Sequence, residues 1–353
     1  MSTPRSLRLP PRVRRCRIST DRGVFAALAA QPARGVCERR PALLVPGYTG
    51  SKEDFLPVLE SLAAAGRRVF AIDMRGQYQS PPAADQGGYS ASELAADIAA
   101  IARAVAEDDS GVHLLGHSFG GLIARQATLA GQTAIGSLTL LGSGPARIGG
   151  QRAALLRGLL AILDPQPAIR PAASAARPAP QHQAAGAGRT TATLATASTA
   201  APAPAGLDDD DVLRAKIRQL WEEQLEPEAK ASGTPPHIVA FLRKRMLGNC
   251  PVGLVMMARY LLCCPDRTSE LAALDLPVLV MYGENDDAWP TDVQNRMARR
   301  LGARRVCIPG AAHSPAVEAP ETTASTLSQF WNDAERPGPR RSQPAPSVRQ
   351  RSA

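Results

Sequence analysis

Aromatic residues are scarce in this chain of 353 residues, since phenylalanine, tryptophan and tyrosine together make up only 4%. Proteins that bind single-stranded nucleic acid stack the bases on aromatic side chains, so this composition argues against such a role. Hydrophobic residues nevertheless reach 44%, which is enough for a buried core built mainly from alanine and aliphatic side chains. The sequence therefore predicts a globular protein with one large domain or two smaller ones.

Cysteines are few, and their spacing fits neither a metal site nor a disulfide framework. No two of the six form a C-x-x-C pair, and the vicinal Cys263 and Cys264 cannot easily bridge to each other. We therefore expect reduced thiols, no metal and no cofactor, as in a cytoplasmic protein. The six are Cys16, Cys37, Cys250, Cys263, Cys264 and Cys307.

Long apolar runs are also missing. No run approaches the roughly 18 residues that span a bilayer. The N-terminus is rich in arginine but has no apolar segment of the kind found in a secretory signal. We expect a soluble protein with no membrane span.

Acidic residues are nearly absent from both ends of the chain. Residues 1–22 carry a net +6 and residues 336–353 a net +5, so about −2 remains for residues 23–335 out of the total of +9. The basic charge therefore belongs to the ends, and we predict disordered tails at 1–11 and 334–353. We expect no nucleic-acid partner, although weak contact of the tails with a polyanion stays open.

A third segment without acidic residues lies inside the chain. Residues 165–207 contain mainly Ala, Pro, Thr and Ser, with few large apolar side chains. Such a segment buries too little surface to offset the entropy lost on ordering, so it is predicted to be a disordered insertion.

Around this insertion, short apolar runs alternate with helical patterns. This alternation predicts an α/β fold with a mostly parallel, doubly wound sheet and an inserted helical cap. The core is assigned to residues 12–142 and 275–333, and the cap to 143–274. Strands are predicted at 41–46, 68–73, 112–115, 135–141, 278–282 and 305–308.

The motif Gly116-His117-Ser118-Phe119-Gly120 lies between a predicted strand and a predicted helix. In this context, G-x-S-x-G forms a sharp turn that exposes the serine hydroxyl above the sheet. Small residues at the two flanking positions keep neighbouring backbone from clashing. Ser118 is therefore the candidate nucleophile, with a serine-capped glycine turn as the alternative.

A serine hydroxyl needs a base, and the base needs an orienting acid. Of the five histidines, His313 alone follows a late predicted strand in a loop, where α/β sheets place their chemistry. For the acid, Asp286 and its neighbour Asp287 both follow the strand at 278–282, and we favour Asp286. His117 should point away from the Ser118 hydroxyl.

Two backbone N–H groups are candidates for an oxyanion hole. One belongs to Phe119, directly after the nucleophile, and the other to Tyr48, in the loop after the first predicted strand. Gly47 allows the backbone of this loop to turn closely beside the serine.

With these residues, the chain resembles the α/β-hydrolases of the esterase and lipase-like group over residues 12–142 and 275–333. Asp73-Met74-Arg75-Gly76 resembles the family's D-x-R-G loop, and Pro46-Gly47 stands where many relatives have His-Gly. The resemblance implies a serine hydrolase that cleaves a carboxylic ester of a small or medium apolar substrate through an acyl-enzyme.

Other functions remain open at this stage. Thioesterases, peptidases, lactonases, C–C hydrolases and perhydrolases use the same three residues, and a catalytically silent binding protein could keep the same fold. The sequence leaves the substrate and the oligomeric state undetermined.

Overall fold

One twisted sheet forms the centre of the molecule. The computed structural model describes residues 2–33, 39–106, 111–131, 135–164 and 210–336. Within these ranges eight strands form a single sheet in the order β1-β2-β4-β3-β5-β6-β7-β8. β2 pairs antiparallel with both β1 and β4, and all the other pairs are parallel. The predicted, mostly parallel sheet is therefore confirmed.

The strand bounds are close to the six predicted ranges, with two further strands at the N-terminal side. The eight strands are β1 (Val13–Thr20), β2 (Gly23–Ala30), β3 (Arg39–Val45), β4 (Arg67–Ile72), β5 (Val112–His117), β6 (Ile135–Leu141), β7 (Val278–Gly283) and β8 (Arg304–Ile308). β5 and β7 are buried along their whole length, as expected for central parallel strands covered on both faces.

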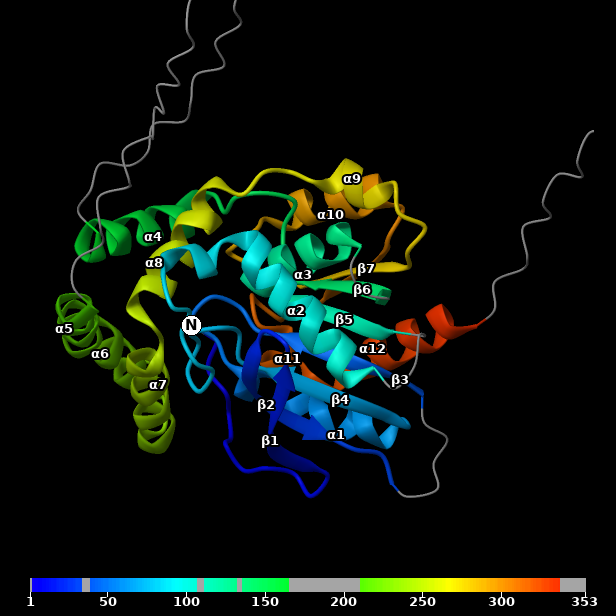
Figure 1. Ribbon diagram of the computed structural model, residues 1–353, viewed down its shortest axis with the longest axis horizontal. Helices are drawn as coiled ribbons and strands as arrows, with labels where there is room; N and C mark the ends of the chain where they lie inside the picture. The colour runs from blue at the N-terminus through cyan, green and yellow to red at the C-terminus, as the bar shows by residue number, and fades with distance from the viewer. Residues whose placement is uncertain (1, 34–38, 107–110, 132–134, 165–209, 337–353) are drawn as a thin grey trace, which may run out of the picture.

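Helices cover both faces of the sheet (Figure 1). One face packs against α1 (Leu56–Ala64), α11 (Pro315–Glu318) and α12 (Pro320–Glu335). The other packs against α2 (Ala91–Val105), α3 (Phe119–Ala130) and α10 (Thr291–Leu301). The doubly wound architecture is confirmed, and it places the carboxyl ends of β3, β5, β7 and β8 along one edge.

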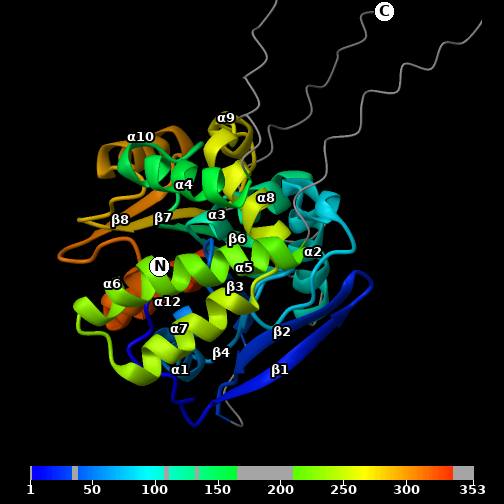
Figure 2. The ribbon, with the colours of Figure 1, turned by 90° about the vertical axis from the view of Figure 1, so that its left-hand side faces the viewer.

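A block of helices is inserted between β6 and β7 and forms the cap. It consists of α4 (Gly150–Leu163), α5 (Asp210–Leu220), α6 (Glu226–Ala231), α7 (Pro236–Gly248) and α8 (Pro251–Cys263). A π-helical turn, Trp221–Leu225, joins α5 to α6. These helices share a small apolar cluster that includes Trp221, Leu242 and Leu254. Figure 2 shows α5, α6 and α7 in front of the sheet edge.

The last helix of the predicted cap packs against helices of the core. α9 (Thr268–Ala272) lies beside α10 and α3, so it joins the helical layer of the core.

Two short 3-10 turns of the core, Lys52–Phe55 and Gln86–Tyr89, precede α1 and α2. The core and cap boundaries remain a proposal about domain organisation.

The ends of the chain differ in part from the predicted tails. Residues 2–11 were expected to be disordered, but Pro4 is buried, and Leu7 and Leu9 pack against the cap and core clusters. These apolar contacts explain why the segment is held despite its arginines. At the other end, α12 continues to Glu335, within the range assigned to the second tail. The insertion at 165–207 and residues 337–353 lie outside the described residues.

Within the described ranges, no single helix is long and apolar enough to cross a membrane. α7 and α8 pass this test only as a pair, and the chain bends by 89° between them.

Candidate active site

Ser118 occupies a strained turn between β5 and α3. Its backbone has φ 53° and ψ −119°, a conformation that L-residues rarely adopt. A side chain at Gly116 would meet the Gly120 carbonyl oxygen at 2.3 Å, and one at Gly120 would meet the Pro46 carbonyl oxygen at 2.4 Å. The two flanking glycines are therefore required by close backbone packing, as the motif predicted.

Hydrogen bonds from a neighbouring strand hold the turn in place. The Ser118 N–H donates to the Leu141 carbonyl at 2.9 Å. The Ser143 hydroxyl, fully buried just beyond β6, donates to the Ser118 carbonyl at 2.8 Å. These two bonds fix the backbone N–H and the carbonyl of the serine.

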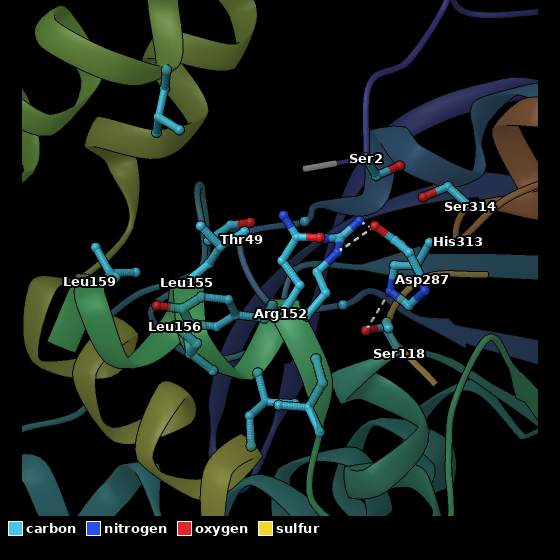
Figure 3. A pocket seen from close by; sticks show the side chains of 18 of the residues that line it. Ser2, Thr49, Ser118, Arg152, Leu155, Leu156, Leu159, Asp287, His313 and Ser314 are labelled. Carbon is cyan, nitrogen blue, oxygen red and sulfur yellow. Dashed lines mark hydrogen bonds and ion pairs between the residues drawn. The ribbon is translucent and has the colours of Figure 1, made fainter. Parts of the chain in front are cut away.

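The structure brings Ser118, His313 and Asp286 together in one chain of hydrogen bonds. Ser118 Oγ lies 2.9 Å from His313 Nε2, and His313 Nδ1 lies 2.9 Å from Asp286 Oδ1. The three residues come from the ends of β5, β8 and β7, which are adjacent or nearly adjacent strands of the parallel sheet. Figure 3 shows the contact between Ser118 and His313.

Asp286 is held by its own local turn. Its Oδ1 accepts the N–H of Ala288 at 2.9 Å and that of Trp289 at 3.4 Å. Its Oδ2 accepts the Gln294 side-chain amide at 3.0 Å. The carboxylate is fully buried and keeps a fixed direction toward the imidazole.

Asp287 faces a different partner. It forms a two-pronged ion pair with Arg152 of α4, at 2.8 and 2.9 Å, and its side chain is 60% exposed. The structure thus separates the two candidate acids: Asp286 contacts His313, whereas Asp287 contacts Arg152 of the cap, as Figure 3 shows.

The His117 side chain, predicted to point away from the Ser118 hydroxyl, contacts the backbone of the His313 loop. Its Nε2 lies 2.8 Å from the His313 carbonyl oxygen, and the two imidazole rings are 5.0 Å apart. Because a carbonyl can only accept, Nε2 carries the proton in this contact. Burial, assisted by the nearby His313, lowers the pKa of His117 to about 3, so the ring is neutral. As a neutral donor, His117 thus helps to hold the His313 loop in place.

Glu318, in α11, also holds the loop that carries His313. Its carboxylate accepts the N–H groups of Ala312 and Ser314, the two neighbours of His313, the latter at 3.1 Å. Sequence reasoning missed Glu318, Gln294 and Ser143, since none of them belongs to a recognisable motif.

The loop of Tyr48 approaches the serine closely. A Cβ at Gly47 would lie 3.1 Å from Ser118 Cβ, and Thr49 has a positive φ of 57°. The Gly47 carbonyl accepts both the Gly50 N–H at 3.1 Å and the buried Gln77 amide at 2.9 Å. These bonds fix the turn that presents Tyr48.

The two predicted oxyanion donors are available. Phe119 is the first residue of α3, so its N–H has no acceptor within the helix. Among the hydrogen bonds recorded for the described residues, none uses the N–H of Tyr48 or of Phe119. Their role in binding an oxyanion stays a prediction.

A cavity of about 880 Å³ opens above Ser118 and His313, between the core and the cap. One wall is apolar and comes mainly from α4. Arg152 and Asp287 lie at the polar side of the cavity. The main apolar contributors are Leu155, Leu156, Leu159, Ile162, Met246 and Leu261. In the parts of the chain that the structure describes, no cluster of His, Cys, Asp and Glu has the arrangement of a metal site.

Comparison with known proteins identifies a family and a relative that this sequence resembles. A sequence model described as "Alpha/beta hydrolase family" matches residues 42–326. A protein of Variovorax paradoxus (strain S110) named "Putative carbamate hydrolase RutD" is 37% identical over 107 residues. That match covers 30% of this chain and 39% of the relative, so the two are similar over well under half of either protein.

Solved structures match over a much larger part of the chain. A thermophilic esterase from Thermogutta terrifontis gives a TM-score of 0.61 at 20% identity, covering 92% of this chain and 100% of that one. The enol-lactonase from Burkholderia xenovorans LB400 gives 0.61 at 16% identity, covering 90% and 100%. At such identities the similarity is evidence for a shared fold.

Proposed function

The chain belongs to the alpha/beta hydrolase family, and from this premise we propose that it is a serine hydrolase that cleaves carboxylic esters. The observation that carries the proposal is the continuous hydrogen-bonded chain from Ser118 Oγ through His313 to Asp286, with both contacts at 2.9 Å. A serine at the start of a helix needs no such partners for a structural role. A nucleophile does.

The proposed reaction has two halves. Ser118 attacks the ester carbonyl carbon while His313 Nε2 takes the hydroxyl proton, and Asp286 stabilises the imidazolium that forms. The N–H groups of Tyr48 and Phe119 hold the negative oxygen of the tetrahedral intermediate. His313 then protonates the departing alcohol, which leaves an acyl-enzyme. Water attacks that acyl group, again with His313 as base, and releases the acid.

The shape of the cavity supports a small or medium apolar substrate. The leucine-rich wall of α4 faces the space above Ser118, and an apolar chain bound there would bury surface against it. Arg152 is paired with Asp287, so the guanidinium that the described residues contribute to the cavity lining is compensated by a carboxylate. We therefore expect neutral substrates to be preferred.

A second candidate is hydrolysis of a carbamate. The relative from Variovorax paradoxus carries that activity in its name, and the three-residue relay proposed here could also attack a carbamate carbonyl. Thioesters, amides and C–C bonds are further options for the same chemistry, and a silent binding protein is the non-enzymatic alternative.

The test is a comparison of Ser118→Ala with Ser325→Ala, which changes an exposed serine on α12 that does not line the cavity. Ser118→Ala should lower kcat for p-nitrophenyl butyrate by about 10⁶-fold and abolish labelling by a fluorophosphonate probe, because the nucleophile is gone. Ser325→Ala should keep both. Wild-type protein that is folded but takes no label would remove the proposal. A parallel panel of thioesters, amides and carbamates then identifies the preferred bond.

A further inference from the structure

The first residues of the chain cross from the cap to the core. Leu7 packs against the apolar cluster of the cap, and Leu9 packs against the cluster beneath α1 and α12. Pro4, which precedes both leucines in the sequence, is buried. We refer to residues 2–9 as the N-terminal strap.

Two hydrogen bonds tie the strap to residues around the active site. The Ser2 carbonyl accepts Arg245 Nη2 of α7 at 2.6 Å, and Arg5 Nη2 donates to the Glu318 carbonyl at 3.2 Å. Arg245 is fully buried and also binds Asp54, at 2.7 Å. Glu318 is the residue whose carboxylate holds the His313 loop. Glu318 itself lines the cavity, and so does Asp54, the partner of Arg245.

Ser2 itself lines the cavity. It belongs to the set of residues that surrounds the space above Ser118 and His313. Figure 3 shows Ser2 beside Ser314, across the cavity from the leucines of α4. The hydrogen bond from Arg245 to the Ser2 carbonyl holds the backbone of Ser2 in this position beside the cavity.

We propose that the N-terminal strap is a wall of the substrate cavity and that Ser2 limits the length of the substrate chain that fits. The inference rests on the proposed function. In an apolar cavity a difference of one methylene changes kcat/KM by about 10- to 200-fold, so a single residue in the wall is enough to set a chain-length preference.

The experiment places the same bulky side chain inside and outside this wall. Ser2→Trp adds an indole to a residue that lines the cavity. Ser6→Trp adds the same indole at an exposed position of the same strap. For each protein we would measure kcat/KM for p-nitrophenyl decanoate and for p-nitrophenyl acetate. The ratio of decanoate to acetate should fall by about tenfold or more in Ser2→Trp, since the indole takes space that the longer chain needs. Ser6→Trp should keep the wild-type ratio.

An unchanged ratio in Ser2→Trp, or an equal change in both variants, would overturn the assignment. Fluorophosphonate labelling of Ser118 separates this failure from that of the proposed function. If the wild-type protein takes the label and the ratio does not move, only the strap is wrong. If the wild-type protein takes no label, the proposed function fails and the strap inference fails with it.

Discussion

Asp286 and Asp287 are adjacent in the sequence, but their different surroundings give the two carboxylates different partners. Asp286 is fully buried and contacts His313 Nδ1, whereas Asp287 is largely exposed and contacts Arg152. Asp286→Asn should lower kcat by about 10³- to 10⁴-fold, because an amide no longer holds the imidazole in the orientation and tautomer that the reaction needs. Asp287→Asn removes an exposed ion pair and should change kcat by less than about tenfold. Steady-state kinetics of both variants provide the measurement, and a larger loss in Asp287→Asn would reverse the assignment.

The residues that the structure brings together at the serine were predictable because they belong to motifs or follow strand ends. Ser118 is defined by its flanking glycines, and Asp286 and His313 by their place after late strands. Gln294 and Glu318 were not predictable. Each becomes important only when a folded helix brings its side chain within hydrogen-bonding distance of a neighbouring loop, at 3.0 Å for Gln294 and 3.1 Å for Glu318.

At the scale of elements, the close approach of α3 to β3 is a second point to test. A methyl group on Gly120 would collide with carbonyl oxygens of Pro46 and Val45, at 2.4 and 2.5 Å, and both are backbone atoms. Gly120→Ala should therefore destabilise the protein by about 1–3 kcal/mol, the usual range for overpacking. It should also displace the loop that carries Tyr48.

The matched control is Gly158→Ala in α4. A Cβ there meets no atom within 4 Å, so the substitution should stabilise the protein by about 0.5–1 kcal/mol, as alanine does in a helix interior. Urea denaturation of both variants gives the two free energies of unfolding. Equal effects at the two glycines would contradict the packing argument.

The strands that sequence reasoning did not specify are β1 and β2. β1 carries Arg14, Arg15 and Arg17, and although the core was assigned from residue 12 onward, no strand was predicted before residue 41. In the structure it is an edge strand with Val13 and Ile18 buried, so the arginines lie where an edge is normally protected by charge. The local charge was read correctly, but pairing with β2 depends on contacts that a charge count does not include.

For the molecule as a whole, the cap is joined to the core by a buried ion pair. Arg245 of α7 and Asp54, beside the Tyr48 loop, are 0% and 3% exposed and lie 2.7 Å apart. Loss of one partner from such a pair leaves a buried charge and typically costs about 3–5 kcal/mol. The helical character of the cap was predictable from its sequence. Its placement over the serine was not, because this link joins residues 191 positions apart.

Stability toward acid is a second property of the whole molecule, and the two histidines of β5 contribute to it. Burial lowers the pKa of His113 to about 4 and that of His117 to about 3. Both rings stay neutral in the folded protein, while in the unfolded chain they take up protons near pH 6.5. The unfolded state therefore binds more protons as the pH falls from about 6.5 toward 4. The free energy of unfolding should decrease by about 1 kcal/mol per pH unit for each histidine.

Replacement of one histidine tests whether these rings cause the loss of stability. The free energy of unfolding would be measured by urea denaturation between pH 7.5 and 4.5. His117→Gln keeps a side-chain donor for the His313 carbonyl but cannot take up a proton, so the decrease with pH should become clearly shallower, whatever the variant's stability at pH 7.5. His237→Gln alters an exposed ring at the start of α7 and should keep the wild-type slope. An unchanged slope in His117→Gln would mean that other groups cause the acid sensitivity, because the slope counts the protons that unfolding takes up.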